Sequence, residues 1–335
     1  MQTTILGPDA VEEAAEMDEL IAAVQAAFAA DALGDTQMPA KSYIDLPEYN
    51  GDFRSMPAYV DARGSDVPGD WDAAAVKWVN VHTDNPADHD LPTVLGTVIY
   101  SDPETAFPLA LLDGTTITRK RTGAAAAVAT DHLAIEDAQS MGIVGAGVQS
   151  YTQLEAVSRV RPIEEVVIAD RDDERVREFV DHFAARFDVR GGSIEEAAAC
   201  DVLSTVTPVE SPIVHSVGER THVNAIGADA ARKHEIADDV LRGAKLVIDD
   251  YEQCTHSGEI NVPWSEGVLG DDDLYGELGA IVVGDLDGRT PTDGVTVFDS
   301  TGLAIQDVAA SHVVYEYARA NDLGDPVSLV DTDVL

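Results

Sequence analysis

A glycine-rich turn in the stretch MGIVGAGVQS, residues 141–150, has the residue types and spacing of a dinucleotide site. Gly145 permits a tight turn, and Gly147 lets the backbone approach a pyrophosphate. The helical spacing that follows would point free N–H groups and a positive dipole end at the phosphates. Ser150 replaces the third glycine of the usual pattern, so a strand-to-helix turn without a ligand is the alternative. The residues expected to contact the dinucleotide here are Gly145, Ala146, Gly147, Val148 and Gln149.

A second apolar run, EVVIAD, ends in Asp170, twenty-five residues after Gly145. A carboxylate at this place can accept both ribose hydroxyls of an adenosine and would repel a 2′-phosphate. Asp170 therefore favours NAD over NADP. The neighbouring Arg171 weakens that preference, because a guanidinium could pair with a phosphate.

The elements around these residues alternate between short apolar strands and amphipathic helices. Such alternation indicates parallel strands joined by crossover helices. We therefore predict an α/β fold in which residues 122–302 form a Rossmann domain, with a doubly wound parallel sheet that binds NAD. Further strands of this domain are expected in CDVLSTVTP, THVNAIGAD and AKLVIDDYE.

Both ends of the chain are expected to build a second, α+β domain. Residues 17–34 have the pattern of an amphipathic helix, and residues 36–118 read as strands separated by Gly, Pro and Asp turns. A C-terminal helix at 303–335, beginning with LAIQDVAASHVVYEYARAND, is apolar on more than one face and so should be buried. The predicted domain comprises residues 1–121 with 303–335 returning to it.

The net charge of −41, from 62 acidic and 21 basic residues, excludes several function classes. Nucleic acid is an unlikely partner, because its binding requires a lysine and arginine face that is not evident. The acids are spread through amphipathic segments, which is typical of a folded halophilic protein from a high-salt cytoplasm. We also expect no membrane span and no signal peptide.

Metal chemistry finds no support in the sequence. The histidines form no HExxH motif, and Cys200 and Cys254 stand alone, so we predict no metal site. His82, His215, His222 and His256 are expected to be polar surface or edge residues.

Three residues outside the glycine turn could do chemistry, although each has an ordinary structural explanation. Lys77 lies in the apolar stretch AAAVKWVNVH, where a lysine usually extends its ammonium past its neighbours to solvent. Arg54 in DFRSMPAY could hold a carboxylate or form a surface ion pair. Asp229 in AIGAD lies near a strand end, where aspartates often cap helices.

Motifs along nearly the whole chain resemble the ornithine cyclodeaminase and mu-crystallin family, in the same order. They are GDFRSMPAY, VKWVNVHTDNP, FPLALLDG, RTGAAAAVATDHLA, GIVGAGVQS, NAIGADAARKHEI, SGEINV and FDSTGLAIQDVAASHVVYE. Within the family, QMPAKSYID and DDYEQCTHSGEINV are more similar to the archaeal alanine dehydrogenases than to the cyclodeaminases. The resemblance implies a cytoplasmic homodimer whose N-terminal domain makes the subunit contact, and an amino-acid or 2-oxo-acid substrate.

The resemblance also implies a role for individual residues. Lys77 matches the family's catalytic lysine, which would exchange a proton with the carbinolamine or carbonyl oxygen of the substrate. Asp229 matches the catalytic aspartate, although AARK follows it where relatives commonly have Gly-Pro-Gly-Lys. Substrate binding falls to Arg54, to Lys41 where cyclodeaminases tend to have arginine, and to Arg121. Arg121 and Thr122 are expected to open a helix, and the remaining cofactor contacts are Thr122, Thr207, Ala228, Ser300 and Gly302.

The favoured function is reversible, NAD-dependent oxidative deamination of L-alanine to pyruvate and ammonia. Ornithine cyclodeaminase, which retains its NAD, and a reductase for cyclic imines or ketimines are the alternatives within the family. A mu-crystallin-like binding protein with little turnover is the alternative from another class. The presence of Lys77, Arg54 and Asp229 together argues against it.

Overall fold

The computed structural model describes residues 1–64 and 67–332. The chain divides into two compact units. Unit 1 comprises residues 1–121 and the chain from Leu303 onward, and unit 2 comprises residues 122–302. Each unit contains its own eight-stranded sheet.

The sheet of unit 2 is parallel in every described ladder, with the order β10-β9-β8-β11-β12-β15-β13-β14. The strand order reverses direction between β8 and β11, because β9 and β10 continue on one side and β11 and β12 on the other. Ligands of doubly wound sheets bind outside the carboxyl ends of the strands at such a reversal. The strands are β8 (Ser140–Val144), β9 (Glu165–Ala169), β10 (Asp188–Gly191), β11 (Val202–Thr205), β12 (His222–Ala225), β13 (Lys245–Ile248), β14 (Leu274–Glu277) and β15 (Thr296–Asp299).

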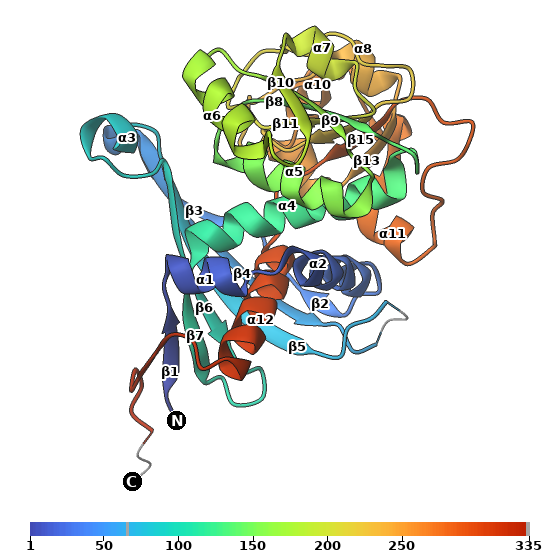
Figure 1. Ribbon diagram of the computed structural model, residues 1–335. Coiled ribbons are helices and arrows are strands. Elements are labelled where there is room, and N and C mark those ends of the chain that lie inside the picture. Colours follow the sequence, from blue (N-terminus) through green and yellow to red (C-terminus); the bar gives the residue numbers. More distant parts are fainter. Residues whose placement is uncertain (65–66, 333–335) are drawn as a thin grey trace. The chain divides into compact units, whose positions relative to one another are not determined.

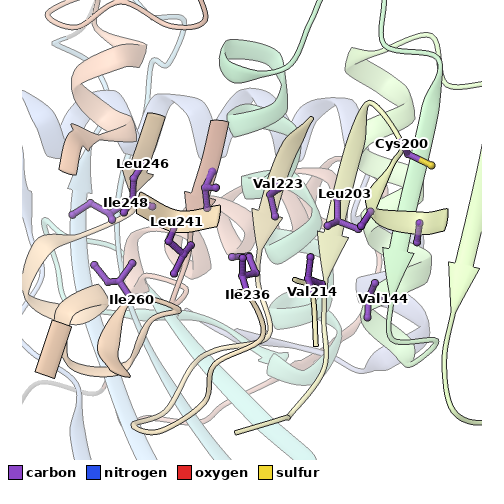
Figure 2. Close-up of a cluster of buried hydrophobic side chains, with 14 of the residues drawn as sticks. Val144, Cys200, Leu203, Val214, Val223, Ile236, Leu241, Leu246, Ile248 and Ile260 are labelled. Atoms are coloured by element: carbon purple, nitrogen blue, oxygen red, sulfur yellow. The ribbon is translucent and has the colours of Figure 1, made fainter. Parts of the chain in front are cut away.

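Alternate side chains of these strands enter two separate cores, one on each face of the sheet. Met141 and Ile143 of β8 pack in one cluster, whereas Val144 packs in the other. Figure 2 shows the second cluster along one face of the sheet, from Val144 through Leu203 and Val223 to Leu246. Burial on both faces explains why these strands read as continuous apolar runs. The helices of unit 2 are α5 (Val148–Val160), α6 (Asp173–Phe183), α7 (Ile194–Ala198), α8 (Asp238–Arg242), α9 (Tyr251–Ser257), α10 (Asn261–Ser265) and α11 (Leu278–Val282).

The sheet of unit 1 is mixed, with the order β16-β1-β7-β6-β5-β4-β2 and β3 paired to β4. Its long strands β4 and β5 pair antiparallel along their whole length, so that Met56 lies opposite Lys77. Successive side chains of both strands point to opposite faces of the sheet, and those on one face are buried. The strands are β1 (Thr3–Leu6), β2 (Thr36–Gln37), β3 (Ser42–Leu46), β4 (Gly51–Asp61), β5 (Asp72–His82), β6 (Val94–Ser101), β7 (Pro108–Asp113) and β16 (Asp325–Val327).

Two helices from opposite ends of the chain lie side by side in unit 1 (Figure 1). Helix α2 (Met17–Ala32) contacts α12 (Ala304–Ala320), and α12 packs on β4 and β5. The N-terminal half of α12, from Ala304 to Ser311, is fully buried, as its all-round apolar pattern predicts. The remaining helices are α1 (Pro8–Ala14), α3 (Asn85–Asp88) and α4 (Gly114–Leu133), whose first eight residues belong to unit 1.

The predicted α/β fold class, with a doubly wound parallel sheet and a second mixed sheet, is confirmed. Three details of the prediction are wrong. Arg121 and Thr122 do not open a helix, because α4 already begins at Gly114, where the Asp113 carboxylate accepts the N–H of Thr116 at 2.9 Å.

The other two corrections concern the C-terminal segment and one histidine. The helix within 303–335 ends at Ala320, and β16 then pairs with β1; residues 333–335 lie outside the described part. His222 is not a surface residue. It is fully buried in β12, with its ring nitrogens 2.9 Å from Thr296 Oγ1 and 3.1 Å from Asn224 Oδ1.

Candidate active site

The glycine turn of unit 2 lies at the point where the strand order reverses. Gly145 follows β8 with a φ of +105°, which a residue with a side chain rarely adopts. A Cβ on Gly145 would lie 2.9 Å from Thr207 Cγ2, so the turn packs directly against the segment after β11. A Cβ on Gly147 would have no atom within 4 Å. Space is therefore left beside the start of α5, whose first turn no side chain of the described residues caps.

Asp170 holds the glycine turn against the end of β9. Its Oδ2 accepts the N–H of Ala146 at 2.6 Å, and its Oδ1 accepts the N–H of Asp172 at 2.9 Å. Each carboxylate oxygen has a further lone pair, so Asp170 can still accept from a ribose hydroxyl. The side chains of Val148 and Arg171 are exposed, whereas Gln149 is half-buried and receives a 3.3 Å hydrogen bond from Thr152.

A buried carboxylate joins the ends of the next two strands of the sheet. Glu235 Oε1 accepts both the backbone N–H of Thr207, at 2.8 Å, and its hydroxyl, at 2.6 Å. Glu235 Oε2 accepts the N–H of Gly227 at 3.1 Å. Burial raises the pKa of Glu235, and hydrogen bonds from Thr207 oppose that rise. Burial, and then the charge of Glu235, raise the pKa of Glu259, which accepts the N–H of Ile236.

Asp249 does the same for the segment that follows β15. Its Oδ2 accepts the Ser300 hydroxyl at 2.9 Å and the N–H of Gly302 at 3.0 Å. Gly302 has a φ of +77°, so a glycine is needed for this turn. Asp299 accepts N–H groups of Glu259 and Ile260, and burial raises its pKa to about 7. The predicted cofactor residues Thr207, Ser300 and Gly302 are thus all fixed by buried carboxyl groups.

Asp229 lies in the loop after β12, just beyond the buried Ala228. Its side chain is 36% exposed and forms an ion pair with Lys233, the last residue of AARK. Arg232 adopts a φ of +75°, and its N–H donates to Asn261 Oδ1 at 2.8 Å. Lys233 stands where Gly-Pro-Gly-Lys also has its lysine, so the ion pair with the candidate acid/base residue does not depend on the departure. The departure instead places Arg232 at a glycine position, in a backbone conformation that glycine adopts more easily.

Two cationic site residues of unit 1, Lys77 and Arg121, pair with one buried carboxylate. Lys77 is only 1% exposed, and its Nζ lies 2.8 Å from each oxygen of Asp307 in α12. Arg121 Nε donates to Asp307 Oδ1 at 3.0 Å, and Arg121 Nη1 donates to Gln306 at 2.9 Å. Burial lowers the pKa of Lys77 to about 7; Asp307 acts against this shift, and the charges of Arg121 and Lys41 add to it. Lys77 therefore does not extend to solvent. Because its pKa lies near 7, it can exchange a proton near neutral pH.

Arg54 is nearly buried on β4 and is held in a fixed orientation. Its Nη2 donates to Asp52 Oδ2 at 2.9 Å, and its Nε donates to the same oxygen at 3.1 Å. The guanidinium also lies 5.6 Å from the ring centroid of Tyr43. The half-buried Lys41 precedes β3 and bears electrostatically on Lys77. Thr122 is buried in α4, and its carbonyl accepts from Gln153 at 3.4 Å.

The comparisons with known proteins agree along nearly the whole chain. The model of the ornithine cyclodeaminase/mu-crystallin family matches residues 1–322. The alanine dehydrogenase of Archaeoglobus fulgidus is 44% identical over 330 residues, which are 98% of this chain and 98% of the relative. The chain belongs to the ornithine cyclodeaminase/mu-crystallin family.

Two solved structures have the same fold as this chain. An archaeal alanine dehydrogenase dimer with bound NAD is 43% identical, with a TM-score of 0.92 over 98% of this chain and 100% of that one. The Δ1-pyrroline-2-carboxylate reductase of Thermococcus litoralis, in complex with NADH and L-proline, is 33% identical, with a TM-score of 0.90 over 96% and 99%. In the described part of the chain, no helix has the length and apolar character needed to cross a bilayer.

Sequence reasoning missed the acids that hold these groups. Asp307 belongs to the family motif FDSTGLAIQDVA, but no role was assigned to it. The available signal was an acidic residue in a helix predicted to be buried, since a buried carboxylate needs a cation or several donors. Glu235 and Asp249 gave no comparable signal among 62 acids.

Proposed function

We propose that this chain is an NAD-dependent alanine dehydrogenase, which converts L-alanine, water and NAD⁺ into pyruvate, ammonium, NADH and a proton and also catalyses the reverse reaction. The observation that carries the proposal is the buried Lys77, paired with Asp307, in a chain 44% identical to the Archaeoglobus fulgidus alanine dehydrogenase. A lysine buried beside two other cationic residues suits proton transfer better than a structural role, because burying it is costly.

Unit 2 has the features that a dinucleotide requires. The residues that would hold NAD are the glycine turn with the N-terminus of α5 for the pyrophosphate, and Asp170 for the adenosine ribose. Thr207, Ala228, Ser300 and Gly302 lie after strands of the same sheet and would contact the nicotinamide half. NAD, when bound, accepts a hydride from C2 of the amino acid.

The remaining steps are proton transfers and substrate binding. Arg54 and Lys41 would bind the substrate carboxylate, with Arg121 as a further cation, and so fix the orientation of C2. Asp229 would take a proton from the attacking water. Lys77 would then take the hydroxyl proton of the carbinolamine as ammonia leaves, and would return it in the reductive direction.

We further propose that the protein forms a homodimer through the face of the unit 1 sheet that α2 and α12 leave uncovered. Ile5, Leu111, Ile99, Val76 and Pro57 form one cross-strand row on this face. Ile5 and Ile99 are each 40% exposed, and Trp78 on the same face is 44% exposed. Such an apolar face suits a second copy of the chain. The dimer of the archaeal alanine dehydrogenase structure supports this proposal.

The deciding experiment follows absorbance at 340 nm in multimolar KCl, with pyruvate, ammonium and NADH, and in parallel with L-alanine and NAD. We expect NADH to be consumed by the wild type and by Lys245→Met, which removes a lysine paired with Asp293 in unit 2. Lys77→Met should abolish the reaction. Formation of proline from ornithine with catalytic NAD would instead establish the cyclodeaminase, and NADH consumption only with Δ1-pyrroline-2-carboxylate would establish the imine reductase. NADH binding without turnover of any of these substrates would favour the mu-crystallin-like protein.

A further inference from the structure

Lys77 and Asp307 are brought together from distant parts of the sequence. Lys77 projects from β5 on the covered face of the sheet, and Asp307 projects from the first turn of α12, 230 residues later. Both side chains are at most 2% exposed. The only other described hydrogen-bond partner of Lys77 Nζ is Thr118 Oγ1 of α4, at 3.1 Å.

The single carboxylate of Asp307 pairs with two cationic side chains. Its Oδ1 lies 2.8 Å from Lys77 Nζ and 3.0 Å from Arg121 Nε. Arg121 is fixed further by Gln306, which precedes Asp307 and accepts from Arg121 Nη1 at 2.9 Å. The described cluster of Lys77, Arg121 and Asp307 therefore carries one more positive than negative charge when all three groups are ionised. Without the carboxylate, two buried cations would face each other.

We propose that Asp307 is a positioning residue of the reaction, which fixes the Lys77 ammonium in place and determines the pH at which Lys77 gives up its proton. This inference rests on the proposed function, because it specifies how the acid/base group of that reaction is controlled. The C-terminal helix would then have a chemical role as well as a packing role.

The groups that face Lys77 leave Asp307 as the one described acid that stabilises its charged form. From α4 the guanidinium of Arg121 opposes that form, and so does Lys41 before β3. The residues opposite Lys77 on the neighbouring strands are Met56 and Val98, which are apolar. Burial also opposes the ammonium form. Removing the Asp307 charge should therefore favour neutral Lys77 at lower pH.

The test uses the full-length protein labelled with [ε-¹³C]lysine. The chain has only five lysines, so the spectrum is simple, and the Lys77 signal is identified by its loss in Lys77→Met. The ¹³C shift is titrated in the wild type, Asp307→Asn and Thr118→Val at constant KCl. We expect the Lys77 midpoint to fall by about one pH unit or more in Asp307→Asn. In Thr118→Val, which removes only a neutral partner, it should move by less than about half a unit.

An unchanged Lys77 midpoint in a folded Asp307→Asn protein would overturn the proposal. If that variant does not fold, Arg121→Met replaces it. Loss of the opposing cation should then raise the midpoint, and no change would again overturn the proposal. These titrations need no turnover, so they stand even if the proposed dehydrogenase activity is absent. If it is present, the bend in the pH profile of kcat/KM should shift with the Lys77 midpoint, whereas a purely structural loss would lower kcat/KM without moving the bend.

Discussion

The carboxylate of Glu235 accepts both the backbone N–H and the hydroxyl of Thr207, at 2.8 and 2.6 Å. The same carboxylate accepts the N–H of Gly227, two residues before Asp229. A Cβ on Gly227 would lie 2.2 Å from Glu235 Oε2, so the backbone can approach the carboxylate only because this residue is glycine. Glu235 thus ties together the two segments that follow β11 and β12.

We expect Glu235→Gln to weaken NADH binding while the protein remains folded. A glutamine has one acceptor oxygen, and its NH₂ group would face a backbone N–H, so one of the two segments loses its anchor. The loss of about one hydrogen bond corresponds to a roughly tenfold increase in Kd. Fluorescence titration with NADH measures this change, and Glu178→Gln, on the exposed face of α6, is the matched control. Equal Kd values for Glu235→Gln and the wild type would show that the carboxylate has no role in holding the site.

Asp170 should control the choice between NAD and NADP. Asp170→Asn keeps an oxygen that can accept from the Ala146 N–H but removes the negative charge that would repel a 2′-phosphate. Arg171 could then pair with that phosphate. We expect the ratio of kcat/KM for NADP to that for NAD to rise by about tenfold or more. Asp172→Asn is the control, because asparagine caps α6 as well as aspartate does. A ratio that rises equally in both variants would point to general charge loss.

Much of the fold could be predicted because its signals are local. The strands around Met141 and Val166 are buried on both faces and read as continuous apolar runs. The start of α4 could not be placed in this way, because its cap Asp113 ends a strand and resembles a turn residue. Pairing of β1 with β16 joins residues more than 300 positions apart, and a four-residue strand and a three-residue strand carry too little pattern to predict it.

The candidate site was predictable where a motif carried the information. Gly145, Asp170 and Lys77 could be named because of their motifs and their family resemblance. The partners of these groups could not be, because pairs such as Lys77 with Asp307 form only through tertiary packing. The few buried acids are also hard to recognise in the sequence, because they are among 62 acids, most of which are not buried.

Acid should destabilise the protein partly through His312. Its Nδ1 lies 3.0 Å from the buried Tyr100 hydroxyl, and its ring stacks on Trp71 at 4.7 Å. Burial lowers the pKa of His312 to about 4, whereas an unfolded histidine titrates near 6.5. Between these values the unfolded state binds more protons, so the free energy of unfolding falls as pH drops from 6.5 toward 4.

We expect the free energy of unfolding of His312→Gln to depend less on pH than that of the wild type. Between pH 6.5 and pH 4 it should fall by up to about 3 kcal/mol less. Denaturant unfolding at several pH values and constant KCl measures it. His256→Gln, at an exposed position of α9, should keep the wild-type slope. If the free energy of unfolding changes equally with pH in His312→Gln and in the wild type between pH 6.5 and 4, His312 does not titrate as its burial implies.

The uncovered face of the unit 1 sheet should determine the oligomeric state. Ile99→Glu adds a charge at the centre of the row formed by Ile5, Leu111, Val76 and Pro57. Burying that charge in a subunit contact without a partner would cost several kcal/mol. We therefore expect light scattering after size exclusion to give a dimer for the wild type and for Thr292→Glu, at an exposed loop position, but a monomer for Ile99→Glu. A dimeric Ile99→Glu protein would place the subunit contact elsewhere.

The net charge of −41 should make the stability depend on salt over a wide range. At 0.1 M salt, charges interact over about 10 Å, so neighbouring surface acids repel one another, whereas at 1 M this range falls to about 3 Å. We expect Tm to rise by about 10 °C or more between 0.2 and 3 M KCl, because repulsion favours the expanded chain. Changing the exposed Glu13, Glu104 and Glu178 together to Gln should raise Tm at 0.2 M KCl and leave it nearly unchanged at 3 M. An equal effect of the triple variant at both salt concentrations would mean that screening of surface charge is not the cause of the salt dependence.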